Sequence, residues 1–276
     1  MKIKEILEYG KNNLIQKEEP LRLSKMLLKH LLNVTDSHIL IHSDEEMRED
    51  IVNKFKRNIE LLNSGVPLQY ITNKQEFMGL NFYVDSNVLI PQPDTEILVE
   101  EVINVCKENA KVLDLCTGSG AIGISIAKNI ENSEVTLSDI SKKALEIAKK
   151  NAISNEVTDK CKFVLSDMFE NIQDKFDVIA SNPPYIKTKV INTLDKEVQN
   201  EPHLALDGGE DGLYFYKVIA ENAYKYLNKN GILALEIGYD QKEEVINLLE
   251  LEGKYTDIYC KKDLAGNDRI IVCKLK

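Results

Sequence analysis

From residue 111 onward, short apolar runs alternate with helical patterns, and this alternation restricts the chain to few folds. Strands separated by helices pair as a parallel sheet covered on both faces. The expected strands are 111–115, 134–138, 162–166, 176–181, 231–237, 255–260 and 269–275, and the expected helices are 121–130, 141–154, 211–228 and 240–252. A long irregular stretch, 182–209, interrupts the pattern. We therefore predict a doubly wound α/β domain.

The first strand leads into a glycine-rich loop, Cys116-Thr117-Gly118-Ser119-Gly120. With Gly123 this loop satisfies G-x-G-x-x-G, and Asp139 follows at the spacing of a ribose-binding acid. A nicotinamide dinucleotide and S-adenosylmethionine both require such features. Asp114 favours S-adenosylmethionine, because a carboxylate beside a helix N-terminus repels pyrophosphate but attracts a sulfonium and an ammonium group.

The expected strand 176–181 ends in Asn182-Pro183-Pro184-Tyr185. Two prolines fix the backbone and donate no N–H, so this loop offers carbonyl oxygens in a stiff frame. The Asn182 side chain adds an amide oxygen, and Tyr185 adds a flat ring. These groups suit a planar –NH2 group, held through both N–H bonds and stacked on the ring.

Four polar residues occupy the carboxyl ends of expected strands: Asp114, Asp139, Asp167 and Asn182. Ligands of open α/β sheets bind at this edge, near the point where the strand order reverses. The sequence thus predicts one site that combines a nucleoside-like ligand with an amino acceptor.

Residues 1–65 carry helical apolar stripes and predict a small bundle. Pro20 is placed to open one helix, and Ser43 with Glu46 matches a capping box for a helix that stops at Gly65. Residues 69–72 and 80–84 indicate strands, with a hairpin turn at Gly79. We expect a helical docking domain at 1–75, a hairpin and linker at 76–92, and a catalytic domain at 93–276.

Composition narrows the function classes. Residues 1–90 have a net charge of −1 and residues 91–276 have −9, which argues against a broad phosphate-binding surface. The five cysteines are scattered without C-x-x-C, as is typical of reduced thiols. His38 and His42 have no third ligand at a familiar spacing, so no metal is expected. No apolar run is long enough for a membrane span or forms a signal peptide, and we expect a cytoplasmic monomer.

The motifs together resemble class I S-adenosylmethionine-dependent amino-methyltransferases, and the whole chain resembles the glutamine N5-methyltransferases of peptide-chain release factors. The matching segments are 65–71, 89–96, 114–122, 181–185, 201–202 with 205–213, and 235–238. The resemblance implies a mostly parallel seven-stranded sheet with an N-terminal helical domain. It also implies S-adenosylmethionine as cofactor, S-adenosylhomocysteine as product, and class-1 release factors as protein substrates.

The resemblance assigns roles to individual residues. Asn182 and the Pro183 carbonyl would accept the N–H bonds of the glutamine amide in the factor's Gly-Gly-Gln motif, with Tyr185 stacked on it. The substrate contacts would be Asn182, Pro183, Pro184, Tyr185, Glu201 and Pro202. The cofactor contacts would be Asp114, Cys116, Thr117, Gly118, Ser119, Gly120, Asp139, Asp167, Met168 and Asn182.

Two positions depart from the family pattern, which commonly has arginine at Gln92 and glycine at Cys116. An ionic role at position 92 is therefore in doubt. A cysteine at position 116 requires a negative φ and adds bulk beside the cofactor, so we expect altered affinity without loss of binding.

Three alternatives stay open at this point. An adenine-N6 methyltransferase also binds a planar –NH2 group, but the acidic catalytic half and the lack of a basic recognition segment disfavour stable nucleic-acid binding. A non-catalytic cofactor-binding adaptor would not require residues 182–185. A nicotinamide oxidoreductase would share only the glycine loop and Asp139.

Overall fold

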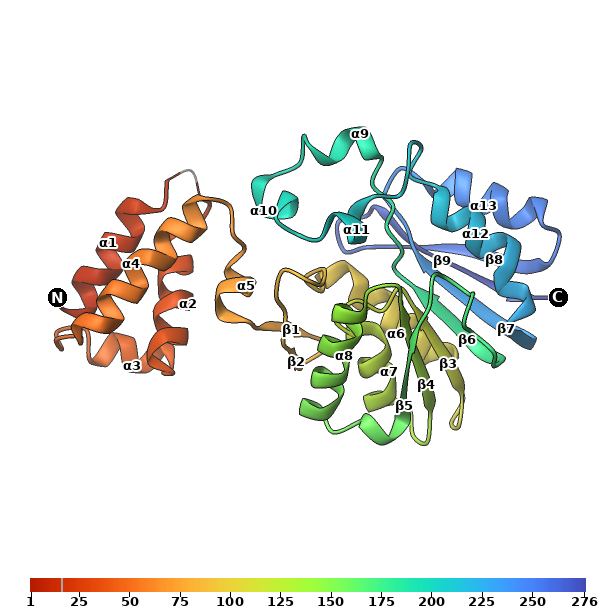
Figure 1. Cartoon of the computed structure of the whole chain (residues 1–276), viewed down its shortest axis with the longest axis horizontal. Coiled ribbons are helices and arrows are strands. Elements are labelled where there is room, and N and C mark those ends of the chain that lie inside the picture. Colours follow the sequence, from red (N-terminus) through yellow and green to blue (C-terminus); the bar gives the residue numbers. More distant parts are fainter. Residues whose placement is uncertain (16) are drawn as a thin grey trace. The chain divides into compact units, whose positions relative to one another are not determined.

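The computed structural model describes residues 1–15 and 17–276, which divide into two compact units (Figure 1). The first unit contains residues 1–73 together with 195–200, and the second contains 74–194 with 201–276. The expected hairpin and linker, 76–92, belong to the second unit.

The first unit is helical. Its helices are α1 (Ile3–Asn13), α2 (Pro20–Leu32), α3 (Asp36–Ile41), α4 (Glu49–Asn63), α5 (Leu68–Thr72) and the short α10 (Lys196–Gln199). Pro20 occupies the first turn of α2, as predicted, because its missing N–H has no helical partner there. Apolar side chains of α1, α2 and α4, among them Ile6, Leu27 and Phe55, form the core of this unit.

Two local predictions for this unit are wrong. Ser43 and Glu46 do not cap α4, which begins at Glu49. Instead, the backbone of this segment pairs with the start of the chain: Lys4 N donates to Ser43 O, and Lys2 bridges to Glu46. The expected strand at 69–72 lies in α5, where Thr72 returns its hydroxyl to the Leu68 carbonyl. Pairing by distant backbone overrode the local signal in the first case.

The second unit contains a hairpin and a larger sheet. The hairpin joins β1 (Gln75–Phe77) to β2 (Leu80–Phe82), and Met78 and Gly79 both have positive φ at its turn, as the Gly79 signal predicted. The sheet strands are β3 (Lys111–Leu115), β4 (Glu134–Asp139), β5 (Cys161–Leu165), β6 (Phe176–Ser181), β7 (Leu227–Glu236), β8 (Tyr255–Lys262) and β9 (Asp268–Leu275).

Helices and short helical turns connect these strands. They are η1 (Pro93–Thr95), α6 (Glu96–Val105), α7 (Ala121–Asn129), α8 (Lys142–Ser154), η2 (Thr158–Lys160), α9 (Thr188–Ile191), α11 (His203–Leu206), α12 (Tyr214–Asn222), η3 (Ala223–Lys225) and α13 (Lys242–Leu251). Ser141 caps α8 through Ala144 N, as predicted. The helix expected at 211–228 is shorter, since β7 already begins at Leu227.

The seven-stranded sheet has the order β5-β4-β3-β6-β7-β9-β8. The strands from β5 to β7 pair in parallel, whereas β9 is antiparallel to both β7 and β8. This confirms the predicted doubly wound, mostly parallel sheet. The strand order reverses between β3 and β6, which places the carboxyl ends of these two strands at the position where such sheets bind ligands.

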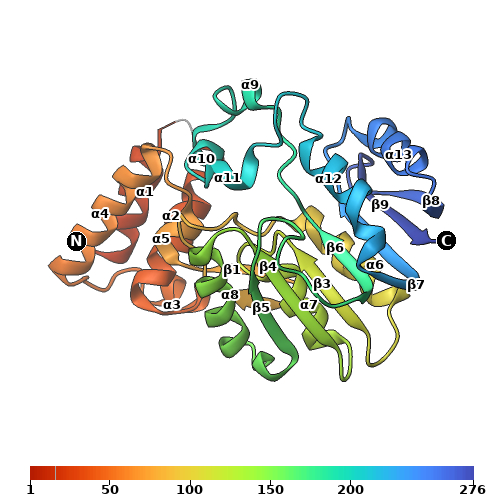
Figure 2. The same ribbon diagram turned by 45° about the vertical axis from the view of Figure 1, so that its right-hand side comes forward.

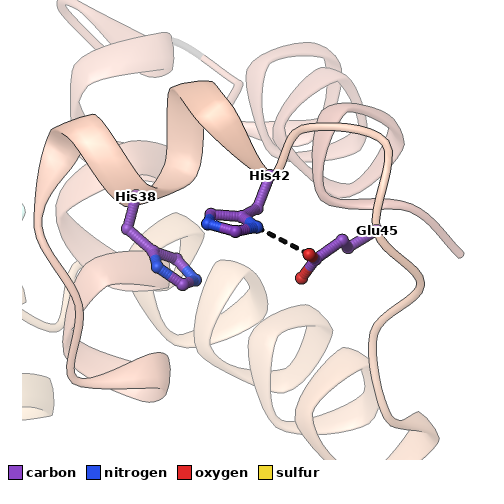
Figure 3. A group of neighbouring side chains, drawn as sticks. All are labelled: His38, His42 and Glu45. Carbon is purple, nitrogen blue, oxygen red and sulfur yellow. Dashed lines mark hydrogen bonds and ion pairs between the residues drawn. The ribbon is translucent and has the colours of Figure 1, made fainter.

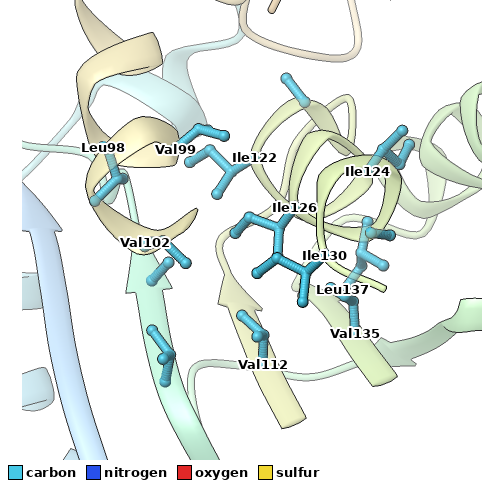
Figure 4. Close-up of a cluster of buried hydrophobic side chains, with 14 of the residues drawn as sticks. Leu98, Val99, Val102, Val112, Ile122, Ile124, Ile126, Ile130, Val135 and Leu137 are labelled. Atoms are coloured by element: carbon cyan, nitrogen blue, oxygen red, sulfur yellow. The ribbon is translucent and has the colours of Figure 1, made fainter. Parts of the chain in front are cut away.

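Each face of the sheet has its own apolar core. Val112 and Val178 pack with α6, α7 and α8, whereas Leu113 and Ile179 pack with α12 and α13 on the opposite face (Figure 2). Figure 4 shows the first core, in which Ile122, Ile126 and Ile130 of α7 and its C-terminus lie against the strands. Successive strand residues alternate between the faces, so these continuous apolar runs are buried on both sides.

No helix in the described ranges 1–15 and 17–276 is both long and apolar enough to span a membrane.

Candidate active site

A cavity of about 270 Å³ lies at the carboxyl edge of the sheet, within the second unit. It brings together residues from the glycine loop, from the ends of β4, β5 and β6, and from the segment before α6. The predicted site residues on its wall are Cys116, Thr117, Gly118, Ser119, Asp139, Asp167, Met168, Asn182, Pro184 and Pro202. The structure therefore places the two principal sequence motifs on one cavity.

The glycine loop uses two of its glycines differently. Gly118 has φ +54, and a Cβ built there would meet no heavy atom within 4 Å, so the backbone borders open space. Gly120 has φ +85 and lies outside the cavity wall; a Cβ there would approach Ile124 Cδ1 to 2.7 Å. Gly118 thus keeps space free for a ligand, whereas Gly120 permits close packing at the start of α7.

Asp114 supports this loop from behind. Its side chain is fully buried and is not part of the cavity wall. Asp114 Oδ2 accepts hydrogen bonds from Thr117 Oγ1 (2.5 Å) and Gly123 N (2.8 Å). Burial raises the pKa of the Asp114 carboxyl to about 7, although these two hydrogen bonds act to lower it. Asp114 thus supports the loop through these hydrogen bonds, and its predicted contact with cofactor cations stays a prediction.

Asp139 does reach the cavity. Its Oδ2 accepts a hydrogen bond from Gly118 N (2.8 Å), and its Oδ1 accepts one from Ser141 N (2.8 Å). Burial raises the pKa of this carboxyl, and the backbone N–H donors oppose that shift. A carboxylate fixed in this way has lone pairs left to accept hydroxyl groups, as a ribose would require.

Cys116 does not have the negative φ expected of it. Its φ is +62, in the left-handed region that disfavours side chains with a Cβ. Its Sγ lies 3.8 Å from Met168 Sδ, and burial raises the pKa of the thiol. The loop geometry therefore imposes the backbone conformation, and the cysteine adopts it under strain.

Met168 and Asp167 form another part of the wall, after β5. Met168 is buried and its carbonyl accepts a hydrogen bond from Ser166 Oγ (2.8 Å), whereas Asp167 is exposed. One apolar and one acidic side chain at adjacent positions can contact a heteroaromatic ring through its face and its edge.

Asn182 belongs to a chain of side-chain hydrogen bonds. Asn182 Nδ2 donates to Thr95 Oγ1 (3.2 Å), and Thr95 Oγ1 donates to Glu236 Oε2 (2.6 Å). Tyr185 Oη donates to the other carboxylate oxygen, Glu236 Oε1 (3.3 Å). Asn182 and Thr95 line the cavity, whereas Pro183, Tyr185 and Glu236 lie outside its wall.

Glu236 is the centre of this network. The residue is only 2% exposed, at the carboxyl end of β7. Burial raises the pKa of the Glu236 carboxyl to about 7, and Thr95, Arg269 and Tyr185 act against that shift. Burial and the adjacent carboxylate also raise the pKa of Tyr185.

The long loop after Tyr185 returns to pack against it. Ile186 N donates to Leu206 O, and Gly208 N donates to Ile186 O. A Cβ at Gly208 would approach Tyr185 Cα to 2.7 Å, so only glycine fits between these backbones.

Glu201 was predicted to contact substrate, but it lies outside the cavity wall. It is buried, and its Oε2 accepts a hydrogen bond from Ile90 N (2.8 Å). Glu201 therefore connects the loop to the segment before α6, and its predicted substrate contact stays a prediction. The neighbouring Pro202 does line the cavity.

Several wall residues were not singled out from the sequence, notably Thr95, Val88 and Phe215. Glu236 was also assigned no role. The signal for Glu236 was available, because it ends a strand, as Asp139 does, at the edge of the sheet where Asn182 also lies. Thr95 offered no comparable signal, since it precedes the first sheet strand.

A separate group of side chains in the first unit could hold a cation. His38, His42 and Glu45 place one ligand atom each within 4.8 Å of one another (Figure 3). Glu45 is the third candidate ligand of this group, which the spacing in the sequence did not indicate. However, the imidazole rings stack at 4.2 Å and His42 Nδ1 lies 2.6 Å from Glu45 Oε1, so these groups have partners without an ion.

Curated relatives resemble this chain over most of its length. It is 42% identical over 255 residues to a protein of Clostridium acetobutylicum named release factor glutamine methyltransferase, covering 90% of this chain and 89% of the relative. A protein of the same name from Agrobacterium fabrum is 36% identical over 260 residues, covering 92% and 90%. The chain belongs to the release factor glutamine methyltransferase family.

Two family models agree with this membership, and a solved structure shows the same fold. Residues 5–72 match the PrmC N-terminal domain, and residues 92–210 match the methyltransferase small domain. A methyltransferase from Pyrococcus furiosus has the same fold, with a TM-score of 0.54 at 21% identity, covering 80% of this chain and 98% of that one. The site also suits the S-adenosylmethionine used by this class of methyltransferase, through the open backbone at Gly118 and the fixed carboxylate of Asp139.

Proposed function

We propose that this protein methylates the side-chain amide nitrogen of the glutamine in the Gly-Gly-Gln motif of class-1 peptide chain release factors. The observation that carries this proposal is the position of Asn182 and Pro184 on the same cavity as Gly118 and Asp139. An amino acceptor and a nucleoside-like methyl donor would share this space. The named relatives support the choice of a release-factor glutamine as acceptor.

Residues of the glycine loop would hold the methionine portion of the cofactor, and Asp139 would accept its ribose hydroxyls. Asp167 and Met168 would contact the adenine at its edge and face. When bound, S-adenosylmethionine supplies a methyl group activated by its sulfonium. The three contact regions lie on one continuous wall, which is consistent with a single extended ligand.

The residues at 182–185 would act mainly by orienting the glutamine. An amide nitrogen is a poor nucleophile, because its lone pair is delocalised into the carbonyl. If Asn182 Oδ1 and the Pro183 carbonyl accept both N–H bonds, the nitrogen is held facing the methyl group. Orientation of this kind contributes about 7–11 kcal/mol in well-positioned reactions. Positive charge develops on nitrogen during transfer, so these acceptors also favour the transition state.

The first unit would serve as a docking domain for the factor, and the protein would act as a monomer without stable nucleic-acid binding. Its own hydrophobic core and its match to a separate family model support an independent role for this unit. The net charge of −9 over residues 91–276 supports a protein substrate over a nucleic acid.

The test combines the protein with a purified class-1 release factor and labelled S-adenosylmethionine, followed by mapping of the methyl group by mass spectrometry. We expect a single methylated glutamine in Gly-Gly-Gln, and loss of transfer in Asn182→Ala even at saturating S-adenosylmethionine. A factor whose motif glutamine is replaced by alanine is the matched substrate control. Labelling of adenine in added nucleic acid, with none in the factor, would overturn the proposal.

A further inference from the structure

The hydrogen bonds around Asn182 have a direction that the chemistry of Glu236 determines. In its ionised form the Glu236 carboxylate has no proton to donate and can only accept. The Thr95 hydroxyl, 2.6 Å from Glu236 Oε2, must therefore give its single proton to that oxygen. Only its lone pairs are then left for Asn182.

This constraint is transmitted to the side-chain amide of Asn182. The amide can approach Thr95 with either Nδ2 or Oδ1, and the two arrangements have nearly the same shape. Because the Thr95 hydroxyl is already committed as a donor, only the arrangement with Nδ2 toward Thr95 makes a hydrogen bond. The oxygen Oδ1 is then the atom left to accept from another group.

We propose that Thr95 and Glu236 are positioning residues that fix the orientation of the Asn182 amide so that Oδ1 accepts the substrate –NH2 group. This inference rests on the proposed function and adds to it the residues that select the reactive orientation. The reversed amide would present Nδ2 to the substrate nitrogen, and two donors would then face each other.

The same carboxylate also holds the ring expected to stack on the substrate. Glu236 Oε1 accepts from Tyr185 Oη (3.3 Å), while Oε2 accepts from Thr95. Glu236 itself does not line the cavity, because it is buried at the end of β7. One buried group thus connects the acceptor oxygen and the aromatic face.

A merely structural link between the segment before α6 and β7 predicts a different outcome from a positioning role. A structural link would affect the free energy of unfolding, with activity following the folded fraction. A positioning role would lower kcat in fully folded protein and leave the affinity for S-adenosylmethionine unchanged. Thr95→Val separates the two, because valine keeps the shape of threonine and removes its hydroxyl.

We expect Thr95→Val to lower kcat about 10-fold to 100-fold, the cost of a misoriented catalytic group, with no change in the Kd for S-adenosylmethionine. Thr95→Ser restores the hydroxyl and should recover most of kcat. In Asn182→Ala the amide is absent, so adding Thr95→Val should cause little further loss. A kcat unchanged in Thr95→Val, or losses that multiply in the double variant, would overturn the proposal.

Glu236→Gln tests the source of the direction. Glutamine has nearly the same size but can donate as well as accept, so it no longer forces the Thr95 hydroxyl to donate. Both orientations of Asn182 then become available, and kcat should fall while cofactor binding persists. Full activity in Glu236→Gln would show that the carboxylate does not set the orientation.

A readout without turnover keeps this inference separate from the proposed function. In protein labelled with ¹⁵N-asparagine, the Asn182 side-chain signal is identified by its loss in Asn182→Ala. One of its two amide protons should show a hydrogen-bonded shift in wild type and Thr95→Ser, and lose it in Thr95→Val. An unchanged signal in Thr95→Val overturns the positioning role, whereas absent methylation by wild type overturns only the proposed function.

Discussion

Cys116 occupies a backbone conformation that most residues avoid. At φ +62 its Cβ is crowded by the neighbouring backbone, a strain of about 1 kcal/mol or more for an L-residue. The strain is located where the loop borders the cavity wall, beside Met168. Its presence shows that the turn out of β3 is determined by the surrounding structure and not by the residue at this position.

The first prediction isolates this strain by comparing two substitutions. Cys116→Ala and Cys116→Gly both remove the thiol, but only glycine relieves the positive φ. We expect the glycine variant to be more stable than the alanine variant by about 1 kcal/mol, measured by urea unfolding. Equal stability of the two variants would mean that the loop relaxes to another conformation.

The second prediction concerns the pH dependence that Glu236 imposes. Its pKa is about 7 in the folded protein, above the ordinary value of 4.5, because it is buried. Below about pH 7 the protonated carboxyl could donate to Thr95, and the constraint on Asn182 would be lost. We therefore expect kcat to fall as the pH drops through about 7, and this limb to be absent in Glu236→Gln.

The sign of the accompanying stability change follows from the same pKa. A raised carboxyl pKa means that the folded state binds the proton more tightly than the unfolded state. Relative to Glu236→Gln, the wild type should therefore lose stability as the pH rises from about 4.5 to 7, and change little above 7. The groups around the carboxyl are Thr95, Tyr185, Arg269 and Asp94. Unfolding curves at several pH values measure this difference, and a stability difference independent of pH would contradict the assignment.

At the scale of elements, the loop from Ile186 to Gly208 is closed where it begins and ends. Its two ends are joined by backbone hydrogen bonds and a parallel bridge between Ile186 and Asp207. Within it, Glu201 Oε2 accepts a hydrogen bond from Ile90 N, and Pro202 lines the cavity. The loop therefore contributes to the site through its closure on Tyr185 as well as through its own side chains.

The third prediction tests this closure with Gly208→Ala. The added Cβ would lie 2.7 to 2.9 Å from backbone atoms of Tyr185 and Pro184, which cannot move independently of Asn182. We expect a loss of about 1–3 kcal/mol in stability, typical of overpacking, together with a lower kcat. Gly253→Ala is a control for kcat alone: a Cβ there meets nothing within 4 Å, but its φ of +62 strains an alanine, so we expect about 1 kcal/mol lower stability with wild-type kcat. Wild-type kcat in Gly208→Ala would show that the loop can separate from Tyr185 without consequence.

The parts of the fold that sequence could predict are those with repeated, local causes. Buried parallel strands are continuous apolar runs, so β3 and β6 were predicted with their observed bounds. Strand ends likewise predicted Asp139 and Asn182 on one cavity. What failed depended on the surrounding structure: the backbone pairing that displaced the Ser43 cap, and the positive φ of Cys116. The role inferred for Thr95 required a three-residue contact that no spacing reveals.

At the scale of the whole molecule, two separate segments of the chain make up the first unit. Residues 195–200 belong to it, although they follow the strands of the second unit in sequence. Asn200 Nδ2 donates to Gly65 O (3.1 Å), and Lys17 forms an ion pair with Glu197. A Cβ at Gly65 would approach Lys196 Cβ to 2.8 Å, so the glycine that ends the α4 region also admits this segment.

The fourth prediction uses limited proteolysis of the full chain. The double variant Lys17→Met with Asn200→Ala removes the ion pair of Lys17 with Glu197 and the hydrogen bond of Asn200 to Gly65, two contacts of the α10 segment. We expect faster tryptic cleavage after Lys196, because local opening becomes easier when few contacts hold a short helix. Cleavage after Lys189, in the second unit, should keep its wild-type rate and serves as the internal reference. No change at Lys196 would show that these contacts do not hold the segment.

The membership of residues 195–200 in the first unit also affects how this protein can be recombined with its relatives. A chimera that exchanges residues 1–73 alone would combine a foreign helical bundle with the native segment 195–200. Any residue larger than glycine at position 65 of that bundle would meet Lys196. The first unit is thus encoded by two separate stretches of the gene. A functional exchange of specificity between relatives would need to transfer both stretches together.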